Sequence, residues 1–358
     1  MNISHFDSFK AIFTPEVNKL KEIFARHNYP LRLAGGPVRD ILLGVMPEDL
    51  DFATPATPDQ MKNMFATERL VILVNKNGER HGTITVMIND KQKFEITTLR
   101  IDKTTDGRHA NVQFTDNWVL DASRRDLTIN SMFLDFGGTL YDYFGGKKDL
   151  DEKRIAFVGD AQIRMQEDYL RILRYLRFYG KISNKENNHD PKIVKAITEN
   201  GSGLANIAGE RIWSELKKIC AGNYIYSLLK LIFDTGMSRY IGLPAVASAE
   251  SLRELYRVCE ATKGLNPNPI TILATVLTKQ DINVLDQRLK LTNSEQAILD
   301  FIIEERRITQ SRSTKYYIDL MIASQPPSKT REKIIEYLKY SGKKNELKDF
   351  LTASAKYQ

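Results

Sequence analysis

The spacing of hydrophobic residues divides the chain into two parts. Up to about residue 150, apolar runs such as LVILV, GTITVMIN and KFEITTLR are separated by turn signals such as Asn77-Gly78. Such runs are typical of strands, whose alternate side chains point to opposite faces. From about residue 151, strand signals nearly vanish and apolar residues recur with the period of a helix. The pattern predicts an α+β fold: a small head with a mixed sheet and helices over residues 1–150, then an all-α region.

Turn and cap residues refine this division. Thr14 and Pro15 suit the N-cap and first position of a helix over residues 14–27. In the all-α region, the NPNP segment near residue 266 is typical of a linker. We therefore predict a helical neck and body over residues 151–265 and a helical tail over residues 266–358.

Two acidic residues stand out in the head. Asp49 and Asp51 lie two apart in a segment that reads as a strand, so their carboxylates are expected on one face. Two such acids repel each other, and Mg²⁺ bridging carboxylates and substrate phosphates relieves the repulsion. The alternative is a solvated strand end. Glu95 alternates with Phe94 and Ile96, so it becomes a third metal carboxylate if its strand neighbours the first; otherwise it is a solvent-facing Glu.

A glycine turn precedes the acids. Gly35 and Gly36 allow backbone N–H groups to approach a ligand, and a helix beginning near Val38 directs its positive end the same way. Arg39 adds a fixed positive charge. Together with the acids, this turn predicts metal-assisted attack on a nucleoside triphosphate.

These residues carry a resemblance to a known family. GGPVRD, followed about ten residues later by DLD, resembles the signature of the class II tRNA nucleotidyltransferases, the CCA-adding enzymes of the tRNA nucleotidyltransferase and poly(A) polymerase family. The resemblance implies a polymerase-β-like head, a third acid on a strand such as that of Glu95, CTP and ATP as substrates, and tRNA as partner. Because poly(A) polymerases share this head, a poly(A) polymerase remains the alternative.

A second motif, Arg124-Arg125-Asp126, follows a possible cap at Ser123, which predicts a helix beginning at Arg124. The resemblance implies that this motif holds the ribose and phosphates of the nucleotide. Arg125 is suited to clamp a phosphate, and Asp126 to accept a hydrogen bond from a sugar hydroxyl. A charged surface turn is the alternative.

The helix predicted over residues 166–180 places Asp168 and Arg171 three residues apart, as neighbours on its surface. A carboxylate accepts from the amino group of cytosine or adenine, and a guanidinium donates to the adjacent ring nitrogen. Uracil and guanine present the opposite polarity, so this pair would select C and A without a template. A surface ion pair is the alternative. Arg174 lies further round the helix, which suggests a phosphate or RNA contact, and Arg177 lies roughly opposite Asp168.

Other segments suggest lesser roles. Residues 100–120 are polar and read as a long loop, in which Arg108 and His109 are candidate contacts. His189-Asp190 suggests a metal phosphohydrolase, but an N-cap at Asp190 explains it better. Trp213, in the GERIW segment, is expected to be structural. Tyr316 and Tyr317 are candidate stacking groups for RNA in the basic tail.

Composition adds partners and compartment. The chain has 358 residues with a net charge of +7, which favours a polyanionic partner such as tRNA. Cys220 and Cys259 lack the spacing of a zinc site and indicate a reducing compartment. The first residues lack a leader pattern, and no apolar run is long enough to span a bilayer. We expect a cytoplasmic or mitochondrial location, a metal site for Mg²⁺ at Asp49 and Asp51, and no membrane partner; monomer and homodimer both remain open.

Overall fold

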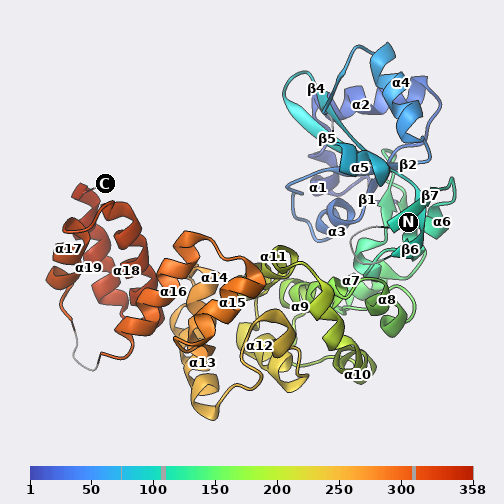
Figure 1. Cartoon of the computed structure of the whole chain (residues 1–358). Coiled ribbons are helices and arrows are strands. Elements are labelled where there is room, and N and C mark those ends of the chain that lie inside the picture. The colour runs from blue at the N-terminus through green and yellow to red at the C-terminus, as the bar shows by residue number, and fades with distance from the viewer. Residues whose placement is uncertain (74, 106–109, 309–311, 358) are drawn as a thin grey trace. The chain divides into compact units, whose positions relative to one another are not determined.

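The structure, a computed structural model, describes residues 1–73, 75–105, 110–308 and 312–357 (Figure 1). It has two compact units: one comprises Met1–Arg171 with Ile182–Asn184, and the other comprises Ile172–Lys181 with Lys185–Gln358. The division after Arg171 falls within a single helix. The three domains with boundaries at residues 150 and 265 stay a prediction. None of the helices in the described part of the chain is both long and apolar enough to cross a membrane.

The head contains a seven-stranded sheet in the order β3-β4-β5-β2-β1-β8-β9. Its strands are β1 (Arg32–Ala34), β2 (Asp51–Thr54), β3 (Val71–Leu73), β4 (Thr83–Ile88), β5 (Gln92–Thr98), β8 (Phe133–Leu134) and β9 (Leu140–Tyr141). Strands β2 and β5 pair in parallel, whereas the other neighbours pair antiparallel. The prediction of a mixed sheet is confirmed.

Helices α2 (Pro15–Arg26) and α4 (Pro58–Thr67) lie together beside β4 (Figure 1). Thr14 accepts a hydrogen bond from the N–H of Val17, as expected of an N-cap, and Pro15 occupies the first position. The rings of Phe24 and Phe65 meet edge to face between the two helices. These contacts cover one face of the sheet.

The opposite face carries a small core of Ala34, Ala53, Leu99, Ala122 and Phe133. Helix α6 (Trp118–Ser123) covers it, and the Trp118 ring packs edge to face on Phe133 at 4.9 Å between centroids. The predicted helix beginning at Arg124 was therefore wrong, because α6 ends at Ser123. Asn117 supplies the cap that we assigned to Ser123, since its side chain accepts from two N–H groups at the start of α6.

The polar segment after β5 is not a simple loop. Strands β6 (Arg100–Thr105) and β7 (Ala110–Phe114) pair antiparallel in a separate two-stranded sheet. The loop prediction failed because a two-stranded ribbon needs few core residues, so its hydrophobic signal is weak. Arg108 and His109 lie outside the described residues.

The remaining elements of this unit are α1 (Asp7–Lys10), α3 (Gly36–Leu42), α5 (Lys76–Arg80), η1 (Thr128–Asn130), α7 (Gly146–Asp151), α8 (Ala161–Glu167) and the start of α9 (Leu170–Ile182). Helix α7 packs so closely on η1 that a Cβ at Gly146 would collide with the carbonyl oxygen of Thr128. This close approach ties α7 to the segment that follows the Arg124-Arg125-Asp126 motif.

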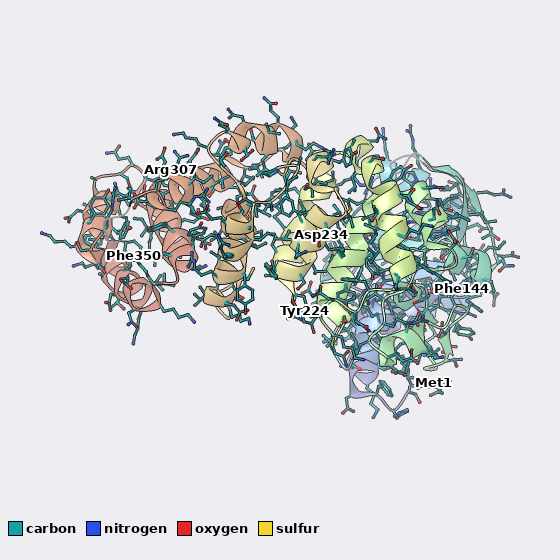
Figure 2. The ribbon with its side chains drawn as sticks, turned by 90° about the horizontal axis from the view of Figure 1, so that it is seen from below. Met1, Phe144, Tyr224, Asp234, Arg307 and Phe350 are labelled. Carbon is teal, nitrogen blue, oxygen red and sulfur yellow. The ribbon has the colours of Figure 1, made fainter. Side chains whose placement is uncertain are left out.

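Every secondary-structure element in the described residues of the second unit is a helix. Its elements after α9 are α10 (Pro191–Asn200), η2 (Gly201–Asn206), α11 (Gly209–Cys220), α12 (Ile225–Asp234), η3 (Ser238–Ile241), α13 (Ala249–Ala261), α14 (Pro269–Leu273), η4 (Ala274–Val276), α15 (Asp281–Leu289), α16 (Asn293–Glu305), α17 (Thr314–Ile322), α18 (Pro327–Ser341), α19 (Lys344–Ser354) and η5 (Ala355–Tyr357). Tyr224 and Asp234 mark the two ends of α12 in Figure 2. The prediction of an all-α region is confirmed.

Three local predictions concern this unit. Trp213 is structural, because its buried indole donates a hydrogen bond of 3.0 Å to Glu295. Asp190 caps α10 as expected. The stacking role of Tyr317 was wrong, since its side chain is 1% exposed and its hydroxyl donates to Glu305.

Candidate active site

The acidic residues come together through strand pairing. Strands β2 and β5 run parallel with Asp51 directly opposite Glu95, so the two side chains leave the same face of the sheet. The strand of Glu95 does neighbour that of Asp51, which is the condition for a third metal carboxylate, and that role of Glu95 stays a prediction. Asp49 departs from the prediction: β2 begins at Asp51, and Asp49 lies in a bend before it. All three acids are exposed.

The electrostatics of Asp51 reflect this crowding. Partial desolvation raises the pKa of Asp51 above its ordinary value, the charges of Glu95 and Asp49 raise it further, and Arg125 lowers it. Because the Asp51 side chain is exposed to solvent, we give the like charges of its neighbours more weight than desolvation. Because the charges of Asp49 and Arg125 both shift the pKa of Asp51, these two residues lie near enough to interact with it electrostatically.

The glycine turn approaches the same place. Gly35 has φ +73°, in the left-handed region, and its N–H donates to the carbonyl of Met132 at 3.0 Å. An added Cβ at Gly35 would lie 3.0 Å from Nη1 of Arg125. Helix α3 begins at Gly36, two residues earlier than predicted. A Cβ at Gly36 would meet only the end of the Arg39 side chain, at 3.8 Å.

Asn130, which we did not predict, connects several of the predicted residues. Its side-chain oxygen accepts from Nη1 of Arg39 at 2.6 Å, its amide donates to Asp126 at 3.4 Å, and its carbonyl accepts from Arg125 at 3.4 Å. The guanidinium of Arg39 also pairs with Asp40 and is 5% exposed. Direct contact of Arg39 with a phosphate stays a prediction, and the structure shows Arg39 bracing the segment around Asn130.

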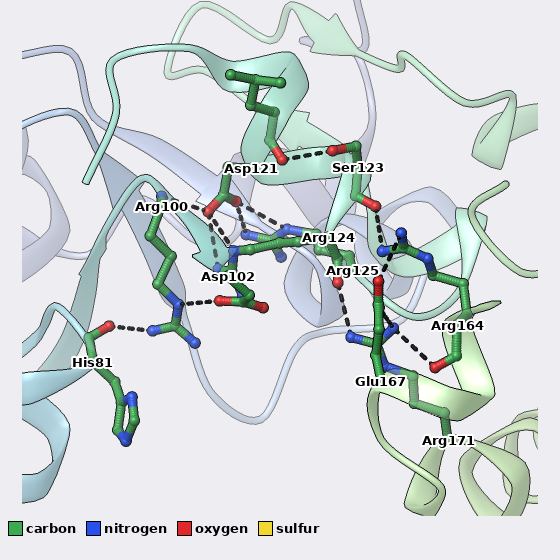
Figure 3. A network of polar contacts seen from close by, with 11 residues as sticks. His81, Arg100, Asp102, Asp121, Ser123, Arg124, Arg125, Arg164, Glu167 and Arg171 are labelled. Carbon is green, nitrogen blue, oxygen red and sulfur yellow. Dashed lines mark hydrogen bonds and ion pairs between the residues drawn. The ribbon is translucent and has the colours of Figure 1, made fainter. Parts of the chain in front are cut away.

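A second unpredicted residue holds the arginines of the motif. The carboxylate of Asp121, near the end of α6, accepts hydrogen bonds from the side chains of Arg124 and Arg125 (Figure 3). Its signal in the sequence is its spacing, because three and four residues bring both arginines to the same side of a helical turn.

The residues proposed to select the base do not share a helix. Asp168 has extended backbone between α8 and α9, and its carboxylate accepts from the N–H of Leu170 at 3.0 Å. The single helix predicted over residues 166–180 was therefore wrong. Arg171 lies in the first turn of α9, so the two residues remain near each other in the chain.

Arg171 contacts the segment of the second motif. Its guanidinium donates to Glu167 at 2.7 Å, to the carbonyl of Arg164 at 3.2 Å and to the carbonyl of Arg124 at 2.9 Å (Figure 3). The base-selecting candidate Arg171 is thus attached to the chain that carries the phosphate-binding candidate Arg125.

Arg174 and Arg177 belong to the second unit. Arg177 forms an ion pair with Glu215 at 3.2 Å, so its charge is neutralised within the helical unit. The role of Arg174 in nucleotide or RNA binding stays a prediction.

The donor set suits a hard cation. Within the described residues, no group of three or more His, Cys, Asp and Glu side chains is close enough to form a complete metal site. Mg²⁺ does not require one, because it is commonly held by one or two carboxylates together with waters and substrate phosphates. The juxtaposed oxygens of Asp51 and Glu95, with Asp49 nearby, fit such a partial site.

We predict that Gly35→Ala impairs nucleotide binding far more than Gly36→Ala. An alanine at position 35 is strained by its positive φ and displaces Arg125, whereas at position 36 it makes an ordinary contact. Nucleotide affinity should fall by about tenfold or more for Gly35→Ala, measured by equilibrium binding of CTP and ATP. Equal affinities of the two variants would contradict the importance of the Gly35 turn.

Comparisons with known proteins identify the family. Residues 31–156 match the family described as Poly A polymerase head domain, and residues 189–249 match the family described as Probable RNA and SrmB- binding site of polymerase A. The chain is 50% identical over 347 residues to the Homo sapiens protein named CCA tRNA nucleotidyltransferase 1, mitochondrial. This match covers 95% of the chain and 79% of the human protein.

Two solved structures share the fold. The CCA-adding enzyme of Bacillus stearothermophilus in complex with CTP aligns with a TM-score of 0.71 at 23% identity, covering 98% of this chain and 83% of that one. The Thermotoga maritima CCA-adding enzyme complexed with tRNA aligns with a TM-score of 0.67 at 18% identity, covering 98% and 86%. Since half of the residues match the human enzyme over most of both chains, this chain belongs to the CCA tRNA nucleotidyltransferase family, whose head domain is shared with the poly(A) polymerases.

Proposed function

We propose that this enzyme adds C, C and A to the 3′ end of tRNA, using CTP and ATP and releasing pyrophosphate. The observation that carries the proposal is the parallel register of Asp51 with Glu95, on the face where Arg125 approaches Gly35. In a metal-bound triphosphate, the carboxylates would bind the cation and the guanidinium would bind the phosphates. The names of the relatives supply the substrate class.

We propose Mg²⁺ as the cation, held by Asp49 and Asp51 with help from Glu95. When bound, the ion would lower the pKa of the attacking hydroxyl and stabilise charge on the departing pyrophosphate. Within the part of the chain that the structure describes, no cationic side chain bonds to these exposed carboxylates, so their mutual repulsion favours cation binding.

The reaction forms a bond between the tRNA 3′ oxygen and the α-phosphorus, and breaks the bond from that phosphorus to the pyrophosphate. The hydroxyl proton passes to solvent, so no general base is required. Arg125 would hold the triphosphate and Asp126 the ribose. Gly35 and Gly36 would let the backbone approach the phosphates. Arg39 would support this turn through Asn130, whose side chain it bonds and whose carbonyl lies beside Gly35.

Base selection would fall to Asp168 and Arg171, by the matching of donors and acceptors. Both belong to the unit that carries the acids. Because the Arg171 guanidinium is held by Glu167 and by two backbone carbonyls, its orientation is restricted before the base arrives. A fixed guanidinium rejects a base that presents a donor to it.

The partner would be tRNA, and Arg174 would contact its backbone or the nucleotide phosphates. The net charge of +7 favours a polyanion. The mammalian and fish relatives are named mitochondrial, which supports a mitochondrial location here, alone or with a cytoplasmic pool.

Extension of a tRNA that ends at its discriminator base tests the function. CTP alone should add two residues, and a third should appear only when ATP is also present. Products are sized on a denaturing gel. A growing ladder with ATP alone would establish a poly(A) polymerase instead.

Asp51→Asn should abolish incorporation, by about a thousandfold or more, without unfolding the head. Removing one of three crowded charges relieves repulsion, so the melting temperature without metal should stay the same or rise. Addition of Mg²⁺ should raise the melting temperature of the wild type more than that of the variant. Glu22→Gln, an exposed change on α2, is the matched control; activity retained in Asp51→Asn would refute the assignment.

Asp168→Ala should relax base choice, with incorporation of U and G rising by about tenfold or more relative to C and A. Single-nucleotide extension with each of the four triphosphates measures this ratio. The variant also loses a hydrogen bond to the start of α9, so Asp160→Ala, which loses the N-cap of α8, is the control. Unchanged selectivity in Asp168→Ala, or equal relaxation in both variants, would argue against base reading by Asp168.

A further inference from the structure

Asp121 occupies an unusual place in the head. Its side chain is 1% exposed, and it lies on α6, which packs against β6 of the β6–β7 ribbon. A buried carboxylate is costly unless cationic donors surround it. Burial alone would raise the pKa of Asp121, but Arg125 and Arg124 outweigh burial, so its pKa lies below the ordinary value. The carboxylate is therefore charged at neutral pH.

Each carboxylate oxygen of Asp121 accepts hydrogen bonds from the side chain of a different arginine. Oδ1 accepts from Nε and Nη2 of Arg124 at 3.0 and 2.9 Å, and also from the backbone N–H of Arg100 at 3.1 Å. Oδ2 accepts from Nε and Nη2 of Arg125 at 3.2 and 2.9 Å. Each guanidinium thus presents one edge, with two donors, to one oxygen (Figure 3).

This arrangement fixes the orientation of Arg125. Adjacent arginines repel each other and would separate in solvent, but the shared carboxylate holds both. With one edge bound to Asp121 and Nη1 directed to the carbonyl of Asn130, the guanidinium lies over the Phe133 ring at 4.9 Å. Its position beside Gly35 therefore depends on Asp121.

The cluster also keeps a surplus of positive charge. Arg100, Arg124 and Arg125 surround two acids, Asp121 and Asp102. Asp102 lies 3.6 Å from Arg100 and 3.8 Å from Arg124, beyond good hydrogen-bond distance. With three cations and two anions, the cluster has a net positive charge. Arg125 is the member of the cluster whose charge lowers the pKa of Asp51.

We propose that Asp121 is a positioning residue that orients Arg125 for the phosphates of every incoming nucleotide, an inference that rests on the proposed nucleotidyl transfer. Phosphates are common to CTP and ATP, whereas the base is read elsewhere. Asp121 therefore affects the binding of both nucleotides equally and leaves the choice between them unchanged.

The primary test is Asp121→Asn, which keeps the shape but replaces one oxygen by a donor that opposes a guanidinium. The KM for CTP and the KM for ATP should each rise by about tenfold or more, by similar factors, with a smaller change in kcat. In an Arg125→Ala background, the same substitution should raise KM by less than about twofold, because its effect acts through Arg125. Selectivity against UTP and GTP should not change.

Asp149→Asn is the matched control. Asp149 is also 1% exposed and pairs with Arg154 and Thr128, but it makes no contact with Arg125 in the described structure. It should lower the melting temperature without raising KM, which separates positioning from loss of stability. Should Asp121→Asn fail to fold, Arg125→Lys decides, because lysine keeps the charge but cannot present two donors to one oxygen. It should raise both KM values in the same way.

Three results would overturn the role of Asp121: an unchanged KM in a folded Asp121→Asn or in Arg125→Lys, a rise for only one nucleotide, or a full additional effect in the Arg125→Ala background. These results are interpretable when the wild type extends tRNA with CTP and ATP. A wild type that binds both nucleotides but does not extend tRNA would instead refute the proposed function, and equilibrium binding of CTP and ATP would then test Asp121 directly.

Discussion

The head holds one group of acidic side chains and one group of arginines, and among the residues that the structure describes the protein does not pair the two groups with each other. Asp51, Glu95 and Asp49 crowd negative charge at the start of β2, on one face of the sheet, and the arginines around Asp121 hold a surplus of positive charge near it. Charges of opposite sign this close would normally pair, yet the structure directs Arg125 to Asp121 and leaves the exposed acids to solvent. A ligand that carries both cations and phosphates satisfies the two groups together. The proposed substrate, a metal-bound triphosphate, would therefore neutralise both groups of charges.

Different local structures supply each part of this site. A parallel strand pair brings the acids together, a left-handed glycine admits the arginine, and a break between two helices presents Asp168. Backbone carbonyls join these parts, since Arg171 donates to the carbonyl of the residue that precedes Arg125. The residues proposed to read the base and those proposed to hold the phosphates are thus connected through one short segment. If these roles hold, the connection fixes the base-reading group relative to the phosphate-binding group before a nucleotide arrives.

The sequence predicted those features that depend on local periodicity. The mixed sheet, the all-α region and the facing of Glu95 all follow from alternation or helical spacing. Features that depend on tertiary contacts were missed. The burial of Arg39 against Asn130 joins segments distant in sequence. The clamp at Asp121 is local, and it was missed because the helix was predicted to begin at Arg124 rather than to end at Ser123. The break at Asp168 was missed because Gln166, Glu167 and Leu170 around it favour helix, so the pattern gave no signal that a carboxylate would end one helix and begin the next.

The parallel pairing of β2 with β5 also affects how the chain reaches its folded state. Parallel neighbours cannot be joined by a tight hairpin, and the connection between β2 and β5 consists of α4, β3, α5 and β4. Contacts between distant segments form slowly, because loop-closure entropy is lost before they stabilise the chain. On the ribosome, the acids meet only after the segment through β5 has emerged and folded. A nascent chain therefore cannot present the paired acids until β5 has emerged. A variant that folds slowly would reduce the amount of active enzyme without altering the product that each folded molecule makes.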